Sequence, residues 1–275
     1  MNGTFVDMHI HSYFSDGSLS PQEIARAANE NRVGLIALAD HNVFEGSILL
    51  SEECKKYGIR CVPAVEIDSI ERNNKYHILA YGFDSGDKDF MSFLSHTRFL
   101  LDEVSVKLIE LMRCDYPSFS IPDYMDFSYD RKLGGWKALH YLREKGLTSS
   151  LNEGIRFYSQ YGLTYDKSGY STIPAIIYRI KKAGGFSVLA HPGELIDQTD
   201  IDAFESELRR IVAYGLDGIE CYYPSHTAEA TQVCLNLCRE RDLLITAGSD
   251  CHGVFGKTRV GEMDITPDKL ILKGL

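Results

Sequence analysis

The stretch "DMHIHSYFSDGS" (residues 7–18) places two histidines and two aspartates at and just beyond the end of an apolar strand pattern. The preceding alternation has a period of two, so Asp7, His9 and His11 share one face of the predicted strand. Histidines at positions i and i+2 of a strand project from the same side. The stretch therefore predicts a metal site, provided that later strands supply further ligands.

Composition and charge narrow the class of protein. The chain has 275 residues, 44% hydrophobic and 25% charged, which is typical of one large globular α/β domain. No apolar run is long enough to span a bilayer and the polar start is not a signal peptide, so we expect a cytoplasmic protein with no membrane partner. The net charge of -10 disfavours binding to duplex nucleic acid. Seven scattered cysteines without a C-x-x-C pair predict neither a disulfide framework nor an all-cysteine zinc site.

Strand and helix patterns alternate in the first part of the chain. "SPQE" (residues 20–23) is a capping box that predicts a helix through residue 29, and "GLIALAD" predicts a buried parallel strand. A helix over 44–56 and the strand "RCVPAVEI" follow. "KYHILAYG" comes too soon for a parallel crossover, which needs about a dozen residues or more, so we expect it to run antiparallel.

Residues 87–165 have long helical patterns and predict a helical insertion, a candidate lid, between a first part (1–86) and a second part (166–275) of one α/β domain. The alternation resumes with the strands "FSVLA", "GIECYY" and "LLITAGS", which gives seven strands. Seven mostly parallel strands favour a β/α barrel or a doubly wound sheet.

Ligand-type side chains recur where these strands end, and such ends share one face of a parallel α/β fold. The residues are His9, His11, Asp16, His41, Glu66, His77, His191, Asp250 and His252. A single histidine or aspartate at a strand end is more often structural, but that explanation would have to hold at six strand ends. Nine such ligands are too many for one ion and predict two or three divalent ions, Mn, Zn or Fe, with a bridging carboxylate.

Several motifs resemble the PHP (polymerase and histidinol phosphatase) family of metal-dependent phosphoesterases. They are "DMHIHSYFSDG", "LADHN", "VEI", the histidine of "KYHILAYG", "LAHPG", "GIECYYPSH" and "GSDCHG", in family order over nearly the whole chain. The resemblance is strongest to the branch of nucleotide phosphatases acting on AMP and on 3′,5′-nucleoside bisphosphates. It implies a distorted seven-stranded β/α barrel of the PHP type with the helical insertion.

The resemblance also implies three groups of metal ligands. The first is His9, His11, Glu66 and Asp250; the second shares Glu66 and adds His77 and His191; the third is Asp16, His41 and His252. Some relatives have histidine in place of Asp16, and a carboxylate there favours a harder ion such as Mn²⁺. Asp7 and Asp40 are expected to orient histidines without binding metal.

These ligands imply hydrolysis of a phosphate ester by a metal-bound hydroxide. Asp250 is expected to take part in catalysis as well as in binding metal. His226 is expected to contact the phosphate or to protonate the leaving oxygen, or alternatively to cap the next helix. Lys257 and Arg259 are candidate phosphate-binding residues.

The insertion departs from its relatives. Many of them carry an "RPHxA"-type motif where this chain has "GGWKA" (residues 134–138), and Glu194 stands where some relatives have a basic residue. Glu194 would disfavour a second phosphate beside it. Trp136 and the tyrosines 116, 124 and 129 are expected to form the core of the lid, although their rings are also suited to stacking on a base.

The predicted function is hydrolysis of a phosphomonoester of a small metabolite, with a nucleotide as first candidate. Histidinol-phosphate phosphatase and short-oligonucleotide 3′–5′ exonuclease are the enzymatic alternatives. A metal-binding PHP scaffold without turnover is the alternative outside enzymology, and the nine filled ligand positions argue against it. The sequence does not indicate an oligomeric state.

Overall fold

The computed structural model describes residues 4–164 and 167–275 of the chain. The strands, in chain order, are β1 (Phe5–Ile10), β2 (Val33–Leu38), β3 (Arg60–Cys61), β4 (Ala64–Glu71), β5 (Asn74–Tyr81), β6 (Phe186–Leu189), β7 (Gly218–Tyr222) and β8 (Leu244–Ala247). The α-helices are α1 (Pro21–Glu30), α2 (Glu45–Lys55), α3 (Lys88–Met112), α4 (Ile121–Asp126), α5 (Lys137–Glu144), α6 (Leu151–Gln160), α7 (Ile173–Lys182), α8 (Pro192–Leu195), α9 (Ile201–Val212) and α10 (Ala228–Arg241).

The strands form two sheets, one parallel with the order β1-β2-β3 and one mixed with the order β4-β5-β6-β7-β8. As expected, β5 runs antiparallel to β4, through a full register from Ala64–Tyr81 to Glu71–Asn74. Between the sheets, the described residues form two isolated parallel bridges, His41–Glu66 and Ile10–Cys251. The α/β class is confirmed, whereas a closed seven-stranded barrel is not.

Proline 63 explains why one predicted strand became two. "RCVPAVEI" breaks into β3, which pairs with β2, and β4, which pairs with β5. The amide of Val62 still donates to Ile36 O at 2.9 Å. Pro63 follows with no N–H to donate, and from Ala64 onward the chain pairs with β5 and not with β2.

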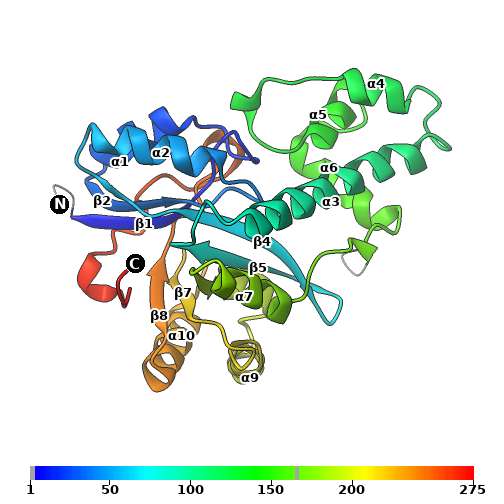
Figure 1. Cartoon of the computed structure of the whole chain (residues 1–275). Coiled ribbons are helices and arrows are strands. Elements are labelled where there is room, and N and C mark those ends of the chain that lie inside the picture. Colours follow the sequence, from blue (N-terminus) through cyan, green and yellow to red (C-terminus); the bar gives the residue numbers. More distant parts are fainter. Residues whose placement is uncertain (1–3, 165–166) are drawn as a thin grey trace.

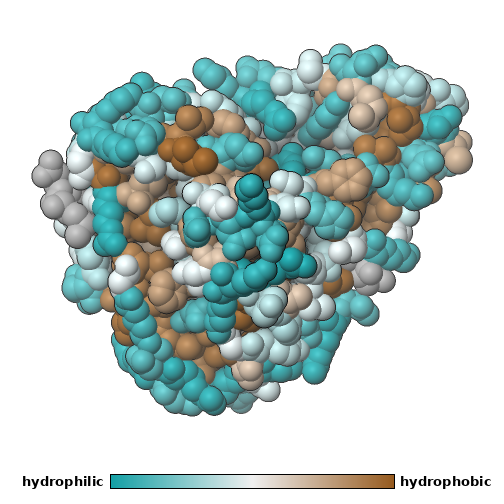
Figure 2. All heavy atoms as spheres, in the orientation of Figure 1, coloured by the Kyte–Doolittle hydropathy of each residue, from teal (hydrophilic) through white to brown (hydrophobic). Residues whose placement is uncertain are grey.

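Helices cover both sheets (Figure 1), with α1 and α2 beside β1 and β2, and with α7, α9 and α10 around β5 to β8. The expected capping box is present, because Ser20 Oγ accepts from Glu23 N and the Glu23 carboxylate accepts from Ser20 N. Hydrophilic residues cover much of the visible face (Figure 2), in keeping with the net charge of -10. No helix in the described ranges is long and apolar enough to cross a membrane.

The helices α3 to α6 extend to one side of the sheets (Figure 1). Their apolar side chains form a separate cluster that includes Met112, Tyr141 and Phe157. The first turns of α3 belong instead to the main core, where Phe90 and Phe93 are buried. The helical insertion is thus a small packing unit joined to the sheets by a long helix. The division at 87–165 stays a prediction, and its second boundary falls at residues 165 and 166, outside the described residues.

Candidate metal centre

The structure gathers the nine predicted ligand residues around the junction of the two sheets. The bridges His41–Glu66 and Ile10–Cys251 are the physical cause, because they join the segments after β2 and β1 to the second sheet. Glu66 is the third residue of β4 and does not end its strand as expected. Seven of the nine side chains are buried. The last two, Asp250 and His252, are partly exposed.

The Glu66 carboxylate lies at the middle of the cluster. Its Oε1 is 2.8 Å from His77 Nδ1 and 2.9 Å from His191 Nε2. Its Oε2 is 3.2 Å from both His11 Nε2 and His41 Nδ1, and 3.4 Å from His9 Nε2. One carboxylate thus faces five imidazoles, two on one oxygen and three on the other.

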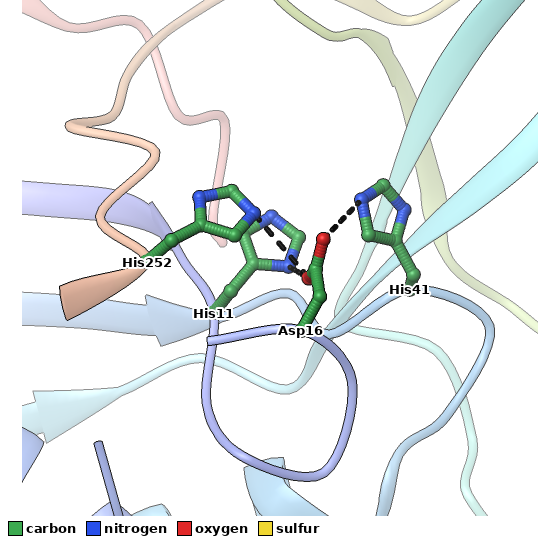
Figure 3. A group of neighbouring side chains, drawn as sticks. All are labelled: His11, Asp16, His41 and His252. Carbon is green, nitrogen blue, oxygen red and sulfur yellow. Dashed lines mark ion pairs between the residues drawn. The ribbon is translucent and has the colours of Figure 1, made fainter. Parts of the chain in front are cut away.

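Asp16 is the centre of a second group, drawn in Figure 3, in which its carboxylate lies among three imidazoles. Its Oδ1 is 3.3 Å from His252 Nε2 and 3.6 Å from His11 Nδ1, and its Oδ2 is 4.0 Å from His41 Nε2. The four residues come from the ends of β1, β2 and β8. His11 also lies beside Asp250, with 3.1 Å between Nε2 and Oδ1, so it stands between two groups of ligands.

Hydrogen bonds at the outer ring nitrogens fix how two histidines face the cluster. His9 Nδ1 is 3.1 Å from Glu220 Oε1, and His252 Nδ1 is 2.8 Å from Asp250 O. Each Nδ1 lies within hydrogen-bond distance of an oxygen, and Nε2 on the other side of the ring faces the neighbouring carboxylates. A carboxylate that holds the far nitrogen of a histidine is the usual partner of a metal-bound imidazole.

Asp250 is held by both backbone and side chain. Its φ of +50° lies in the left-handed region, which is strained for a residue with a Cβ, and its amide donates to His9 O at 2.8 Å. Tyr223 donates to Asp250 Oδ2 at 2.8 Å, so Oδ1 is the oxygen directed to His9 and His11. The strained backbone conformation of Asp250 persists because its amide hydrogen bond and the hydrogen bond from Tyr223 hold the residue in place.

The carboxylates of the cluster need positive charge nearby to balance their own. Burial by itself would raise the pKa of Glu66, but the nearby imidazoles of His77, His41 and His9 hold it well below its usual range. Burial would lower the pKa of His11, but its hydrogen bonds and charge interactions with Asp250 and Glu66 raise it to about 10. Buried carboxylates are therefore ionised and require positive charge, supplied either by protons on the histidines or by metal ions.

Hydrogen bonding supports the same interpretation. Five buried atoms of the cluster make no hydrogen bond within the described part of the chain: Asp16 Oδ1, His41 Nδ1, His77 Nε2, His191 Nδ1 and Asp250 Oδ1. Four of them lie 3.1–3.3 Å from an atom of opposite charge in a neighbouring side chain. Buried polar atoms without hydrogen bonds are rare unless a ligand completes them. Nitrogen and carboxylate oxygen donors fit Zn²⁺, Mn²⁺ or Fe²⁺, so these residues fit divalent metal ions.

Three residues with no role assigned from the sequence pattern also belong to this site. Glu220 is fully buried, contacts His9 and accepts from His191 N at 2.8 Å. Asp68 Oδ1 lies 3.2 Å from His77 Nε2 and its backbone N–H donates to Asn42 Oδ1. Tyr223 is the third. The i, i+2 spacing of Glu66 and Asp68 on one strand face is the signal that could have identified Asp68.

Asp7 and Asp40 differ from expectation, because neither accepts a hydrogen bond from an imidazole ring among the described residues. Asp7 accepts from the amide and hydroxyl of Ser249 at 2.9 and 2.7 Å. Asp40 accepts from Ser12 N at 2.8 Å and from Ser15 Oγ at 2.6 Å. Both carboxylates fix the loops that carry ligands, and Glu220 is the residue that holds an imidazole.

Both ring nitrogens of His226 are engaged with the backbone. Gly193 N donates to Nε2 at 3.0 Å, so Nδ1 carries the proton and donates to Cys221 O at 3.1 Å. Burial lowers the pKa of this imidazole. The ring thus joins the loops after β6 and β7, and its contact with phosphate or with the leaving oxygen stays a prediction. The alternative of a helix cap is wrong, because Thr227 rather than His226 caps α10.

Lys257 and Arg259 are exposed residues on either side of Thr258, whose hydroxyl donates to Asp250 O at 3.2 Å. Neither side chain has an ion pair within the described ranges. The structure thus brings the backbone between them to the cluster, and their contact with phosphate stays a prediction.

The "GGW" part of the insertion docks directly onto the metal-ligand loop. Gly135 N donates to Asp16 O at 2.7 Å, and Gly134 has a φ of +65°. A Cβ on Gly134 would lie 2.5 Å from Phe255 Cβ, so only glycine fits. The Trp136 ring centroid then lies 5.8 Å from that of His41.

Two of the tyrosines expected in the insertion core lie in different surroundings. Tyr124 is buried in the apolar cluster of the insertion. The Tyr129 ring stacks on the His140 ring, with 4.0 Å between the centroids.

Residues 7–144 match the PHP domain family. Among the relatives, a 5′-3′ exoribonuclease from Haemophilus influenzae is 27% identical over 93% of this chain and 93% of its own. A phosphoribosyl 1,2-cyclic phosphate 1,2-diphosphodiesterase from Eggerthella lenta is 28% identical over 91% of this chain and 95% of its own. A 3′,5′-nucleoside bisphosphate phosphatase from Chromobacterium violaceum is 24% identical over 90% and 87%.

Among solved structures, one described as a metal-dependent phosphoesterase from Bifidobacterium adolescentis superposes with a TM-score of 0.76 at 24% sequence identity. The match covers 96% of this chain and 92% of that one, so the two proteins share a fold over nearly their whole lengths.

Proposed function

Because the chain belongs to the PHP domain family, we propose that it is a multinuclear metal-dependent phosphoesterase that hydrolyses a phosphomonoester of a small metabolite, with a nucleotide as first candidate. The observation that carries the proposal is the Glu66 carboxylate facing five imidazoles, in a cluster where five buried atoms make no hydrogen bond among the described residues. The sequence predicts that the protein acts in the cytoplasm.

Three groups of side chains would hold the ions: His9, His11, Glu66 and Asp250; Glu66, His77 and His191; and Asp16, His41 and His252. The geometry supports close variants of these groups, in which His11 also joins Asp16 and His41 also joins Glu66 and His77. Divalent ions bound there supply Lewis acidity toward phosphate oxygens and lower the pKa of water.

The protein's own residues position that chemistry. Glu220 fixes the His9 ring, Tyr223 fixes the Asp250 carboxylate, and Ser249, held by Asp7, fixes the backbone before Asp250. Metal-ligand side chains that are already fixed in place need not rearrange as charge develops on the phosphate. The carboxylates of Glu66 and Asp250 raise the pKa of His9 and His11, so metal binding at these two rings would release protons.

A second candidate is cleavage of a phosphodiester, as in a short RNA. It is favoured by the exoribonuclease and diphosphodiesterase names of the two relatives above, each covering at least 91% of this chain. Histidinol phosphate remains a third candidate substrate.

The test is phosphate release by Mn²⁺-reconstituted protein from AMP, adenosine 3′,5′-bisphosphate, histidinol phosphate and a dinucleotide, with loss of the dinucleotide followed by chromatography. Turnover that EDTA removes, and that the Asp250→Asn variant lacks while its circular dichroism is unchanged, supports the proposal. Metal binding shown by elemental analysis without turnover of any compound would contradict it and favour a metal-binding scaffold.

A further inference from the structure

Arg98 and Trp136 form a pair at the edge of the metal centre, where the insertion docks. The Arg98 guanidinium lies 5.1 Å from the centroid of the Trp136 indole, and the indole lies 5.8 Å from the His41 ring. A cation on α3 is thus connected to a candidate metal ligand through one aromatic ring. Trp136 is the one tryptophan of the chain.

The guanidinium has unused donors. Its Nε donates to Asp102 Oδ2 at 3.1 Å, which fixes one edge of the group. The buried Nη1 has no hydrogen-bond partner among the residues that the structure describes. A guanidinium has five N–H donors in a geometry that suits phosphate oxygens. A buried donor left unpaired beside a catalytic centre indicates a ligand that completes it.

Glu194 differs from Arg98 in charge and in surroundings. It lies three residues after His191, and its carboxylate accepts a hydrogen bond from Ser225 Oγ. The side chains that approach Arg98 are Trp136 and Asp102. The expected effect of Glu194 on a second phosphate therefore concerns a phosphate beside His191.

These contacts also argue against a nucleobase stacked at this point. One face of the indole is covered by Arg98, and Tyr129 is covered by His140 on one side and faces the Arg131 guanidinium at 5.5 Å. Arg98 and Trp136 are instead suited to binding an anion, because the indole holds the guanidinium in place.

Resting on the proposed phosphoesterase function, we infer that Arg98 is a specificity-determining residue that binds a second phosphate group carried by the leaving group of the substrate. Trp136 is its positioning residue. That second phosphate is the far phosphate of a nucleoside bisphosphate or a backbone phosphate of a short oligonucleotide, and the two sources share the same recognition chemistry.

The experiment compares adenosine 3′,5′-bisphosphate and a 5′-phosphorylated dinucleotide with phenyl phosphate, which has no second phosphate, on Mn²⁺-loaded protein. Loss of one charged hydrogen bond predicts that Arg98→Gln lowers kcat/KM by about 10- to 100-fold more for a doubly phosphorylated probe than for phenyl phosphate, chiefly through KM. Arg98→Lys should recover part of the loss. Arg156→Gln is the matched control, because Arg156 lies over the Phe157 ring in the same insertion, and all three rates should be unchanged.

Binding is followed separately by stopped-flow emission of Trp136 before turnover. A selective loss with the bisphosphate or with the dinucleotide supports the inference and identifies the source of the phosphate. Equal losses for all three probes would overturn it and leave the phosphoesterase function intact. Emission that changes with the bisphosphate only when Arg98 is present, without hydrolysis of any probe, would keep the anion site and contradict the proposed function.

Discussion

The strand-end cluster buries its charged groups almost completely, with His9 and His11 at 0% and Glu66 at 1% exposure. The helical insertion, in contrast, has a small apolar core and leaves Met125 and Ile155 more than half exposed. Buried charges require fixed partners, whereas a small helical core tolerates changes of side chain as long as it stays packed. If the proposed function holds, the comparison predicts that substitutions in the buried cluster abolish the reaction, whereas substitutions in the insertion change the choice of substrate.

The largest expected effect is at the middle of the cluster. Glu66→Gln removes a carboxylate that faces five imidazoles, and we expect hydrolysis to fall by more than about a thousandfold, because metal ions supply several kcal/mol of charge stabilisation. Elemental analysis should show fewer bound ions. Glu71→Gln is the control on the same strand, because Glu71 accepts from Tyr214 OH away from the cluster. Equal metal content in Glu66→Gln and wild-type protein would refute the bridging role.

A smaller effect is expected one contact further out. Glu220→Gln keeps the shape of the side chain but loses the charge that holds His9, and we expect metal affinity to fall by about 10- to 100-fold. Activity should return at high Mn²⁺ concentration, which a titration of rate against Mn²⁺ measures. If the titration curve matches that of the wild type, Glu220 has no part in orienting the ligand.

The smallest effect concerns the contact between the two halves. Gly134→Ala and Gly146→Ala both place a Cβ at positive φ, +65° and +73°, at a cost of about 1–2 kcal/mol. Only at Gly134 would the new atom meet Phe255, whereas at Gly146 nothing lies within 4 Å. We expect Gly134→Ala to lose about 1–3 kcal/mol more in the free energy of unfolding.

Activity distinguishes the two glycine variants further. Gly134→Ala should lower turnover, because the loop that it carries docks on Asp16, while Gly146→Ala should leave turnover unchanged. Denaturant unfolding and the rate on phenyl phosphate measure the two quantities. Identical results for both variants would mean that the insertion does not depend on this contact.

The positions of the ligands were predictable because they depend on local patterns. Period-two alternation and the points where apolar strands end identify His9, His11 and Asp250 without any tertiary information. The capping box at Ser20 and the antiparallel direction of β5 follow from spacing alone, and both are confirmed. The PHP family itself was identified from these motifs in their order.

Partners distant in sequence were not predictable in this way. The contact of Glu220 with His9 spans 211 positions, and the pairing of Arg98 with Trp136 joins two parts of the insertion. The hydrogen bond from Gly193 N to His226 Nε2 likewise spans 33 positions.

The sequence by itself determined which residue types stand at the strand ends, and hence the metal chemistry and the α/β class. Only the tertiary structure decided that Pro63 divides a strand between two sheets, which carboxylate holds which imidazole, and where the insertion docks. The physical reason is that periodicity and caps act over a few residues. Pairing and burial, in contrast, depend on which distant groups compete for the same hydrogen bonds and the same space.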